Sequence, residues 1–242
     1  MSGERRACHQ SQCTQVHLNI YTRKKGKTRS MTSNLSPSIF THLASGQQIE
    51  KTVKALHAHG IRVVVCETGE QASKCVLELI PNGATVYDLP SRTLEMIGLS
   101  EQIERATRFQ SVRVQAAALD HTTKRNKIRK LIAAPDVLVG SVHAVTEAGE
   151  VLIASASGSQ LSAAACGASK VIWVVGTQKL VGTLEDGLGR IRDYCLPLES
   201  ERMQRAYGQL SAVSAINKLL TITAEHKPGR ITTVLVKQQL GF

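Results

Sequence analysis

Residues 136–176 read DVLVGSVHAVTEAGEVLIASASGSQLSAAACGASKVIWVVG, and this stretch decides the fold. The apolar run that starts at Asp136 can continue as a strand to Thr146, and residues 171–176 are a second buried strand. Between them, residues 147–150 predict a turn and residues 151–154 a returning strand. A loop of small residues, 155–160, then leads into a helix with an alanine-rich face. The stretch therefore predicts strand, turn, strand, loop, helix and strand.

The sequence before this unit predicts alternating helices and strands. A capping box opens a helix at Ser45, and Gly60 ends it. Residues 61–66 are a valine-rich strand, residues 68–81 a second helix, and residues 84–87 a second strand. This alternation is typical of an α/β fold with a mainly parallel sheet flanked by helices.

The sequence after the unit predicts a different arrangement. Thr183 caps a helix that runs to Tyr194, and residues 197–216 are polar and show no clear element. Residues 218–223 and 231–237 form two strands on either side of a turn at residues 226–229. We therefore expect an antiparallel C-terminal strand pair at one edge of the sheet.

Length and composition limit the class of protein. A chain of 242 residues suits one domain, or one domain with a tail. It contains no apolar run of the roughly 18 residues that would indicate a membrane span, and its start lacks the apolar core of a secretory signal. Its six cysteines form no C-x-x-C pair, and its histidines are scattered. We expect a cytoplasmic protein with cysteines buried in a reducing compartment, no metal site and no membrane partner.

The net charge of +11 raises the question of nucleic acid. Residues 1–30 hold seven basic side chains and one acid, Glu4, which leaves +5 for the rest of the chain. We interpret residues 1–30 as a disordered basic tail or a mis-assigned start, with a basic arm or a transit peptide as alternatives, and residues 31–242 as one domain. The other charges look dispersed, so a nucleic-acid partner is disfavoured.

The loop at residues 155–160 is the first candidate ligand site. A small-residue loop that enters a helix exposes unpaired N–H groups, and these suit a phosphate or carboxylate. The candidate ligand-binding residues of this loop are Ser157, Gly158, Ser159 and Gln160. The loop matches neither a P-loop nor a dinucleotide fingerprint, so it predicts a small anionic ligand and no named cofactor.

Other candidates follow the ends of predicted strands. Glu147 lies in a turn beside this loop and is our candidate general base or nucleophile, with a solvated turn residue as the alternative. Thr146 and Gly149 flank it as candidate ligand contacts. Lys179 follows the strand at 171–176 and could pair with an anion, with an ordinary surface lysine as the alternative. Ser91 and Thr93 follow the strand at 84–87, at the sheet edge where α/β proteins bind ligands, although Ser91 could equally serve as a helix cap.

Residues 136–151 and 170–181 resemble the central signature of the LUD domain of lactate-utilisation protein C type. The ending, with its residues 228–232 and 240–242, and the S-x-T-L motif at residues 91–94 also resemble that family. The resemblance implies the fold of the CoA-transferase and ribose-phosphate isomerase-like superfamily. It also implies a role in oxidation of L-lactate to pyruvate beside iron–sulfur subunits. Some relatives carry a cysteine cluster before the last strands; residues 197–217 here contain none, so we expect no cofactor in this chain.

Three functions compete. The chain could be an accessory or anionic-ligand-binding subunit for lactate utilisation. It could instead be an enzyme that acts on a CoA thioester, folate or sugar phosphate through Glu147. A regulatory or nucleic-acid-binding scaffold is the third hypothesis, supported only by the basic tail. A homo-oligomer is compatible with each of them.

Overall fold

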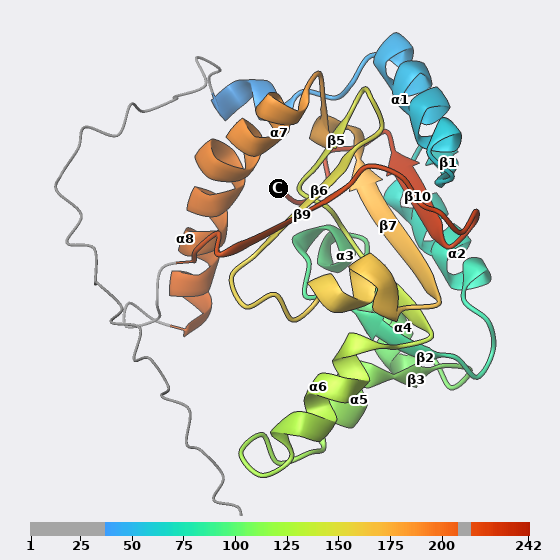
Figure 1. The fold of residues 1–242 in the computed structure, drawn as a ribbon, viewed down its shortest axis with the longest axis vertical. Helices are drawn as coiled ribbons and strands as arrows, with labels where there is room; N and C mark the ends of the chain where they lie inside the picture. The colour runs from blue at the N-terminus through green and yellow to red at the C-terminus, as the bar shows by residue number, and fades with distance from the viewer. Residues whose placement is uncertain (1–36, 208–213) are drawn as a thin grey trace, which may run out of the picture. The chain divides into compact units, whose positions relative to one another are not determined.

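The larger of two sheets contains six strands, all parallel to their neighbours, in the computed structural model, which describes residues 37–207 and 214–242. Across the sheet the strands are β1 (Arg62–Cys66), β10 (Ile231–Val236), β7 (Lys170–Gly176), β4 (Val137–Gly140), β2 (Thr85–Asp88) and β3 (Gln110–Ser111). Figure 1 shows β7 and β10 side by side within this sheet. The four residues of β4 are all buried, which explains why these runs carry apolar side chains without alternation.

The smaller sheet has four strands and mixed directions. Its order is β8 (Leu180–Val181), β5 (Ala144–Thr146), β6 (Val151–Ser155) and β9 (Lys218–Ile222). β6 runs antiparallel to both β5 and β9, whereas β8 runs parallel to β5. The parallel-sheet α/β class predicted from the sequence is therefore confirmed, with a second sheet added to it.

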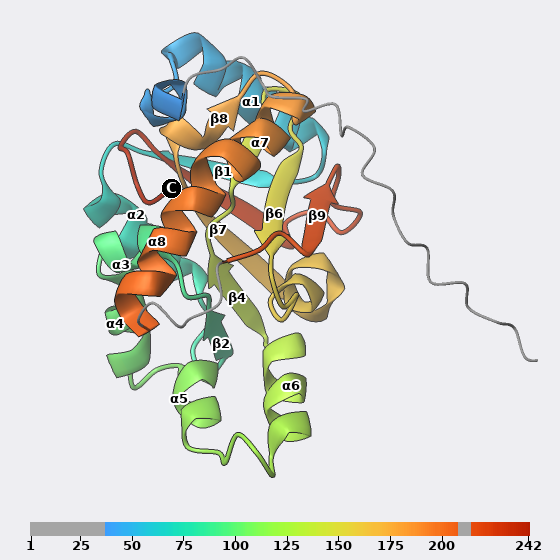
Figure 2. The ribbon, with the colours of Figure 1, turned by 90° about the vertical axis from the view of Figure 1, so that its left-hand side faces the viewer.

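Helices cover both sheets. They are α1 (Gly46–Ala58), α2 (Gly69–Leu79), α3 (Arg92–Met96), α4 (Leu99–Arg105), α5 (Val112–Ala117), α6 (Arg125–Ala133), α7 (Leu184–Arg190) and α8 (Leu196–Tyr207). Short turns of 3-10 helix occupy Pro37–Thr41 and Thr177–Lys179, and π-helical turns occupy Ala163–Gly167 and Ile191–Cys195. In Figure 2, α7 and α8 form one long column, joined by the second π-helical turn. None of the described helices is long and apolar enough to cross a membrane.

The side chains of β7 alternate between two cores. Val171, Trp173 and Val175 join a core that also includes residues of α1 and of the smaller sheet. Ile172 and Val174 face the other way, into a core with residues of α2, α3 and α4. The smaller sheet lies on one face of the larger one, and its own outer face packs against α7.

Two predicted strand arrangements are wrong. Residues 136–146 form two strands in different sheets, because the chain leaves the larger sheet at residues 141–143. Residues 218–222 and 231–236 are strands, but they do not pair. β9 binds the edge of the smaller sheet, and β10 inserts between β1 and β7. Apolar composition identified these strands but held no information about their partners.

The remaining differences concern helices and charge. The helix expected after residues 155–160 is a short turn, whereas the polar segment after residue 196 forms α8. The basic excess is not dispersed. Lys124, Arg125, Lys127, Arg129 and Lys130 lie exposed in or next to α6, with no acid between them. The interpretation of residues 1–30 lies outside the described residues.

Candidate functional site

The candidate site is a cavity of about 620 Å³ where strand ends from both sheets meet. The segments that follow β2, β4 and β7 line it, together with the segment that follows β6 and residues of α8. Because β2, β4 and β7 are parallel, their carboxyl ends lie at the same edge of the sheet. This topology brings together side chains that lie far apart in the sequence.

Lys179 is the central charged group of the cavity wall. The 3-10 turn after β7 places it there, and the residue is only 2% exposed. Its Nζ donates to Thr93 Oγ1 at 3.0 Å, Ser141 Oγ at 3.1 Å and the Val142 carbonyl at 3.3 Å. Burial, followed by the nearby charge of Arg190, lowers the pKa of Lys179 to about 7. The amine is therefore poised between its charged and neutral forms.

The C-terminal segment holds Thr93 in position. Thr93 Oγ1 donates to the Leu240 carbonyl at 3.1 Å, and Gln178 Nε2 donates to the same carbonyl at 2.9 Å. Gly241 follows in the left-handed region with φ of 63°. Phe242 then lines the cavity. The last residues thus form part of the site.

Replacing Gly241 by alanine should disturb this arrangement. A Cβ at Gly241 would lie 2.6 Å from Thr93 Oγ1 and 2.9 Å from its backbone nitrogen, and alanine disfavours this φ. We expect a loss of about 1–3 kcal/mol in the free energy of unfolding, measured by urea denaturation. Gly229→Ala, at a site with a similar φ but open space around it, is the matched control. Equal losses of stability in both variants would contradict the role given to Gly241.

A second buried cation lies behind the cavity wall. Arg190 is fully buried, and its Nη1 donates to the His143 carbonyl and to Cys195 Sγ. Its Nε and Nη2 have no hydrogen-bond partner among the described residues. The guanidinium also lies over the Tyr194 ring, 5.1 Å from its centroid. Burial raises the pKa of the Cys195 thiol although Arg190 and Lys179 oppose that shift.

His143 is held as a neutral imidazole. Its Nδ1 accepts from the Ala154 N–H at 3.2 Å, so that nitrogen carries no proton. Burial, then the charges of Lys179 and Arg190, lower the pKa of His143 to about 3. The imidazole ring is therefore an uncharged part of the cavity wall at physiological pH.

The pH dependence of stability should report this imidazole. In the unfolded chain, His143 takes up a proton below its ordinary pKa of about 6.5. In the folded protein it does so only near pH 3. Stability is therefore lost as pH falls from 6.5. His143 is only half-buried, so we expect about 1 kcal/mol between pH 6.5 and 5 after solvent screening. Urea unfolding of wild type and His143→Gln at both pH values should show a shallower slope for the variant. Equal slopes would contradict this assignment.

The loop at residues 155–160 reaches the cavity but differs from the expected anion cradle. The Gly158 N–H donates to Ser155 Oγ at 2.8 Å, and the Ser159 N–H donates to Ser157 Oγ at 3.2 Å. These backbone donors are thus already used within the loop, and the helix that follows is short. Ser157, Ser159 and Gln160 line the cavity with side chains instead. Gln160 Oε1 accepts from Ser155 and Ser159, which leaves its NH₂ group as the end available to donate.

Ser91 joins this side of the cavity. It lines the wall together with Thr93 and Lys179, as expected from their positions after strand ends. Its hydroxyl makes no capping hydrogen bond to α3, although Ser91 occupies the N-cap position. The cavity therefore brings together Ser91, Thr93, Ser157, Ser159, Gln160 and Lys179 of the predicted ligand-binding residues.

Glu147, Thr146 and Gly149 lie elsewhere. The turn that contains them is at one end of the β5–β6 pair, and the loop at residues 155–160 follows the other end of β6. The Glu147 carboxylate pairs with Lys51 Nζ of α1 at 2.7 Å, and Gly149 packs against the same helix. The expectation that Glu147 lies beside the loop is wrong, because an antiparallel hairpin separates them. Its catalytic role stays a prediction without support from the cavity.

Sequence reasoning overlooked several residues of the cavity wall. They are Ser141, His143, Cys195, Glu199 and Arg202. The apolar run predicts one strand through Ser141 and His143, whereas both residues lie in the crossing between the two sheets. They directly follow Gly140, and this glycine at the end of an apolar run was the signal that could have indicated the end of a strand. Cys195, Glu199 and Arg202 reach the cavity because the chain stays helical past Tyr194, through the π-helical turn at Ile191–Cys195 and into α8.

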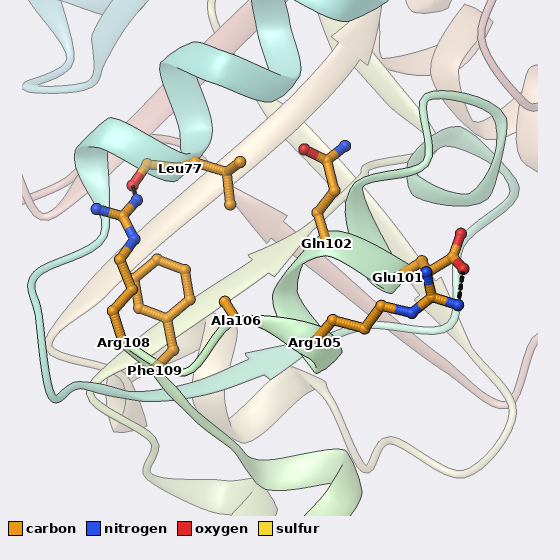
Figure 3. A pocket seen from close by; sticks show the side chains of 7 residues that line it. All are labelled: Leu77, Glu101, Gln102, Arg105, Ala106, Arg108 and Phe109. Carbon is orange, nitrogen blue, oxygen red and sulfur yellow. Dashed lines mark hydrogen bonds and ion pairs between the residues drawn. The ribbon is translucent and has the colours of Figure 1, made fainter.

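A smaller hollow of about 400 Å³ lies between α2 and α4 (Figure 3). Figure 3 shows Arg108 stacked on Phe109 and reaching the Leu77 carbonyl, and Arg105 paired with Glu101. Both arginines of this hollow already have partners. It therefore offers less to an anionic ligand than the cavity around Lys179. Among the described residues, no three metal-binding side chains come together.

Comparison with known proteins identifies a family model and several solved structures. The family model described as the LUD domain matches residues 49–239. A solved structure described as a DUF162 family protein from Deinococcus radiodurans matches 84% of this chain and 98% of its own, with 12% identity and a TM-score of 0.48. That structural likeness is too distant to carry an argument about function. No curated protein matches the chain.

Proposed function

Because the chain belongs to the LUD domain family, we propose that it supports L-lactate utilisation as an accessory protein that binds a small anionic ligand in the cavity around Lys179. The family match covers most of the chain and includes every described strand, from β1 to β10. The proposal assigns no reaction to Glu147.

One observation carries the proposal. Lys179 and Arg190 are buried at or behind the cavity wall, and neither contacts a carboxylate among the described residues. A buried cation without a counter-ion is costly, and an anion in the cavity would offset that cost. Glu199 is the acid on the wall, and it is already bound by Arg202 through two contacts of 2.7 Å. The side chains of the cavity wall therefore carry an excess of positive charge.

The neutral polar groups support an oxygen-rich ligand. The hydroxyls of Ser91, Ser157 and Ser159 and the amide of Gln160 line one side of the cavity. Ser157 donates its hydroxyl proton to Ser159, and Ser159 donates its own to Gln160 Oε1. The donors that suit the oxygens of a carboxylate or phosphate are therefore the Ser91 hydroxyl and the Gln160 NH₂ group. Leu89, Ile153 and Ile191 add apolar surface to the wall, and a less polar surrounding strengthens the attraction between the ligand and Lys179.

Calorimetry on the full chain tests the proposal. Titration with L-lactate, pyruvate and inorganic phosphate at pH 6.5 should give saturable binding of at least one carboxylate, and raised salt should weaken it only moderately because the site is buried. A strain without the protein should grow poorly on lactate and normally on glucose. Absence of binding by all three anions at millimolar concentration, or normal growth on lactate, would overturn the proposal.

A further inference from the structure

The contacts of Lys179 fit a neutral amine as well as an ammonium group. Thr93 Oγ1 uses its proton on the Leu240 carbonyl, so it accepts from Lys179, and the Val142 carbonyl can only accept. The Ser141 hydroxyl, 3.1 Å from Nζ, can accept or donate. A neutral amine would thus donate twice and receive the Ser141 proton on its lone pair. Every contact stays satisfied when Nζ loses one proton.

The surroundings also favour the neutral form. No carboxylate contacts Nζ among the described residues, and the nearby fixed charge is that of Arg190. Together with burial, this holds the pKa of Lys179 at about 7, so a substantial fraction is a free amine at neutral pH. A desolvated lysine beside another cation is the setting in which enzymes use lysine as a nucleophile toward carbonyl groups.

We propose that Lys179 Nζ forms an imine with the carbonyl carbon of a small 2-oxo acid bound in the cavity. This inference rests on the proposed function, since it takes the anionic ligand of the same cavity and adds a carbonyl group to it. The carboxylate lies among the hydroxyl and amide donors, and the carbonyl faces Nζ and Ser141.

The step balances without an oxidant or reductant. The Nζ lone pair attacks the carbonyl carbon, and the carbonyl electron pair moves to its oxygen. Ser141 is placed to take a proton from Nζ and pass one to that oxygen, because its hydroxyl lies 3.1 Å from Nζ and lines the cavity. The carbinolamine then expels its hydroxyl with a proton as water, and the nitrogen lone pair forms the C=N bond. Protonation of the imine restores the positive charge of the original ammonium.

Trapping by reduction tests the proposal on the wild-type full chain. Pyruvate, the probe used, is added with sodium borohydride, and the modified lysines are located by peptide mass spectrometry. We expect a carboxyethyl group on Lys179, saturable in pyruvate, at least about tenfold more abundant than on the exposed Lys54. L-lactate, which has no carbonyl, should compete without itself becoming attached. The trapping rate should rise as pH increases through 7, whereas reversible affinity for L-lactate should fall.

Two variants separate the imine from simple binding. Lys179→Arg keeps a cation but offers no nucleophilic amine, so it should give no adduct at position 179 even at the highest pyruvate concentration. Ser141→Ala should bind pyruvate and form the adduct more slowly, about tenfold or more. Pyruvate binding by calorimetry without an adduct on wild-type Lys179 would overturn the imine and leave the anion site standing. An adduct spread equally over Lys179 and Lys54 would also overturn it. If the wild type bound none of the tested anions, both proposals would be overturned.

Discussion

Replacement of Lys179 by methionine should weaken binding of the anionic ligand by about 100-fold, the largest effect we expect on function. The variant loses the positive charge that faces the ligand in a buried site, and we expect this loss to cost about 2–3 kcal/mol of binding free energy. Methionine has a similar unbranched shape, so the space around the chain should stay filled. Calorimetry with pyruvate and L-lactate measures the change, and circular dichroism with urea unfolding checks the fold.

The control variants distinguish this charge from general basicity. Lys54 lies on α1, pairs with Glu50 and is exposed, so Lys54→Met should leave affinity unchanged within about twofold. Glu147→Gln should also leave binding unchanged, because its carboxylate pairs with Lys51 away from the cavity. Binding by Lys179→Met within threefold of the wild type would show that Lys179 does not hold the ligand.

The sequence predicted the parallel sheet because burial on both faces leaves a strong signal. β7 is apolar from Val171 to Val175, and these five residues each join one of two cores. The pairing of β9 and β10 could not be predicted in the same way. A strand's own side chains indicate that it is buried, but its neighbours depend on the path of the chain through α7 and α8.

The candidate site was predictable where it follows strand ends. Ser91, Thr93 and Lys179 could be proposed because parallel strands bring their carboxyl ends to one edge. Arg190 could not, since its importance comes from burial behind His143 and Cys195 and not from its position in a motif. Glu147 shows the opposite case: it is near the loop at 155–160 in the sequence, but the two lie at opposite ends of β6.

Replacement of Trp173 by alanine should give the largest loss of stability, about 3–5 kcal/mol in the free energy of unfolding. Trp173 is fully buried in the middle strands of the larger sheet, and its ring fills the space above Gly140. A Cβ at Gly140 would lie 2.9 Å from that ring and 2.6 Å from Leu89. The indole N–H has no partner among the described residues, so the loss comes from packing and not from a hydrogen bond.

Urea unfolding of a matched series tests this packing. Trp173→Phe removes less volume together with the unpaired donor, so it should cost only about 1–2 kcal/mol. Gly140→Ala should cost about 1–3 kcal/mol in the wild type by overpacking, and less in the Trp173→Ala background, where the ring no longer opposes the new methyl group. Strict additivity of the two changes would contradict direct contact. Ser141 follows Gly140 and binds Lys179, so the same overpacking should also lower the affinity for the anionic ligand. This effect would link the core of the larger sheet to the cavity at its edge.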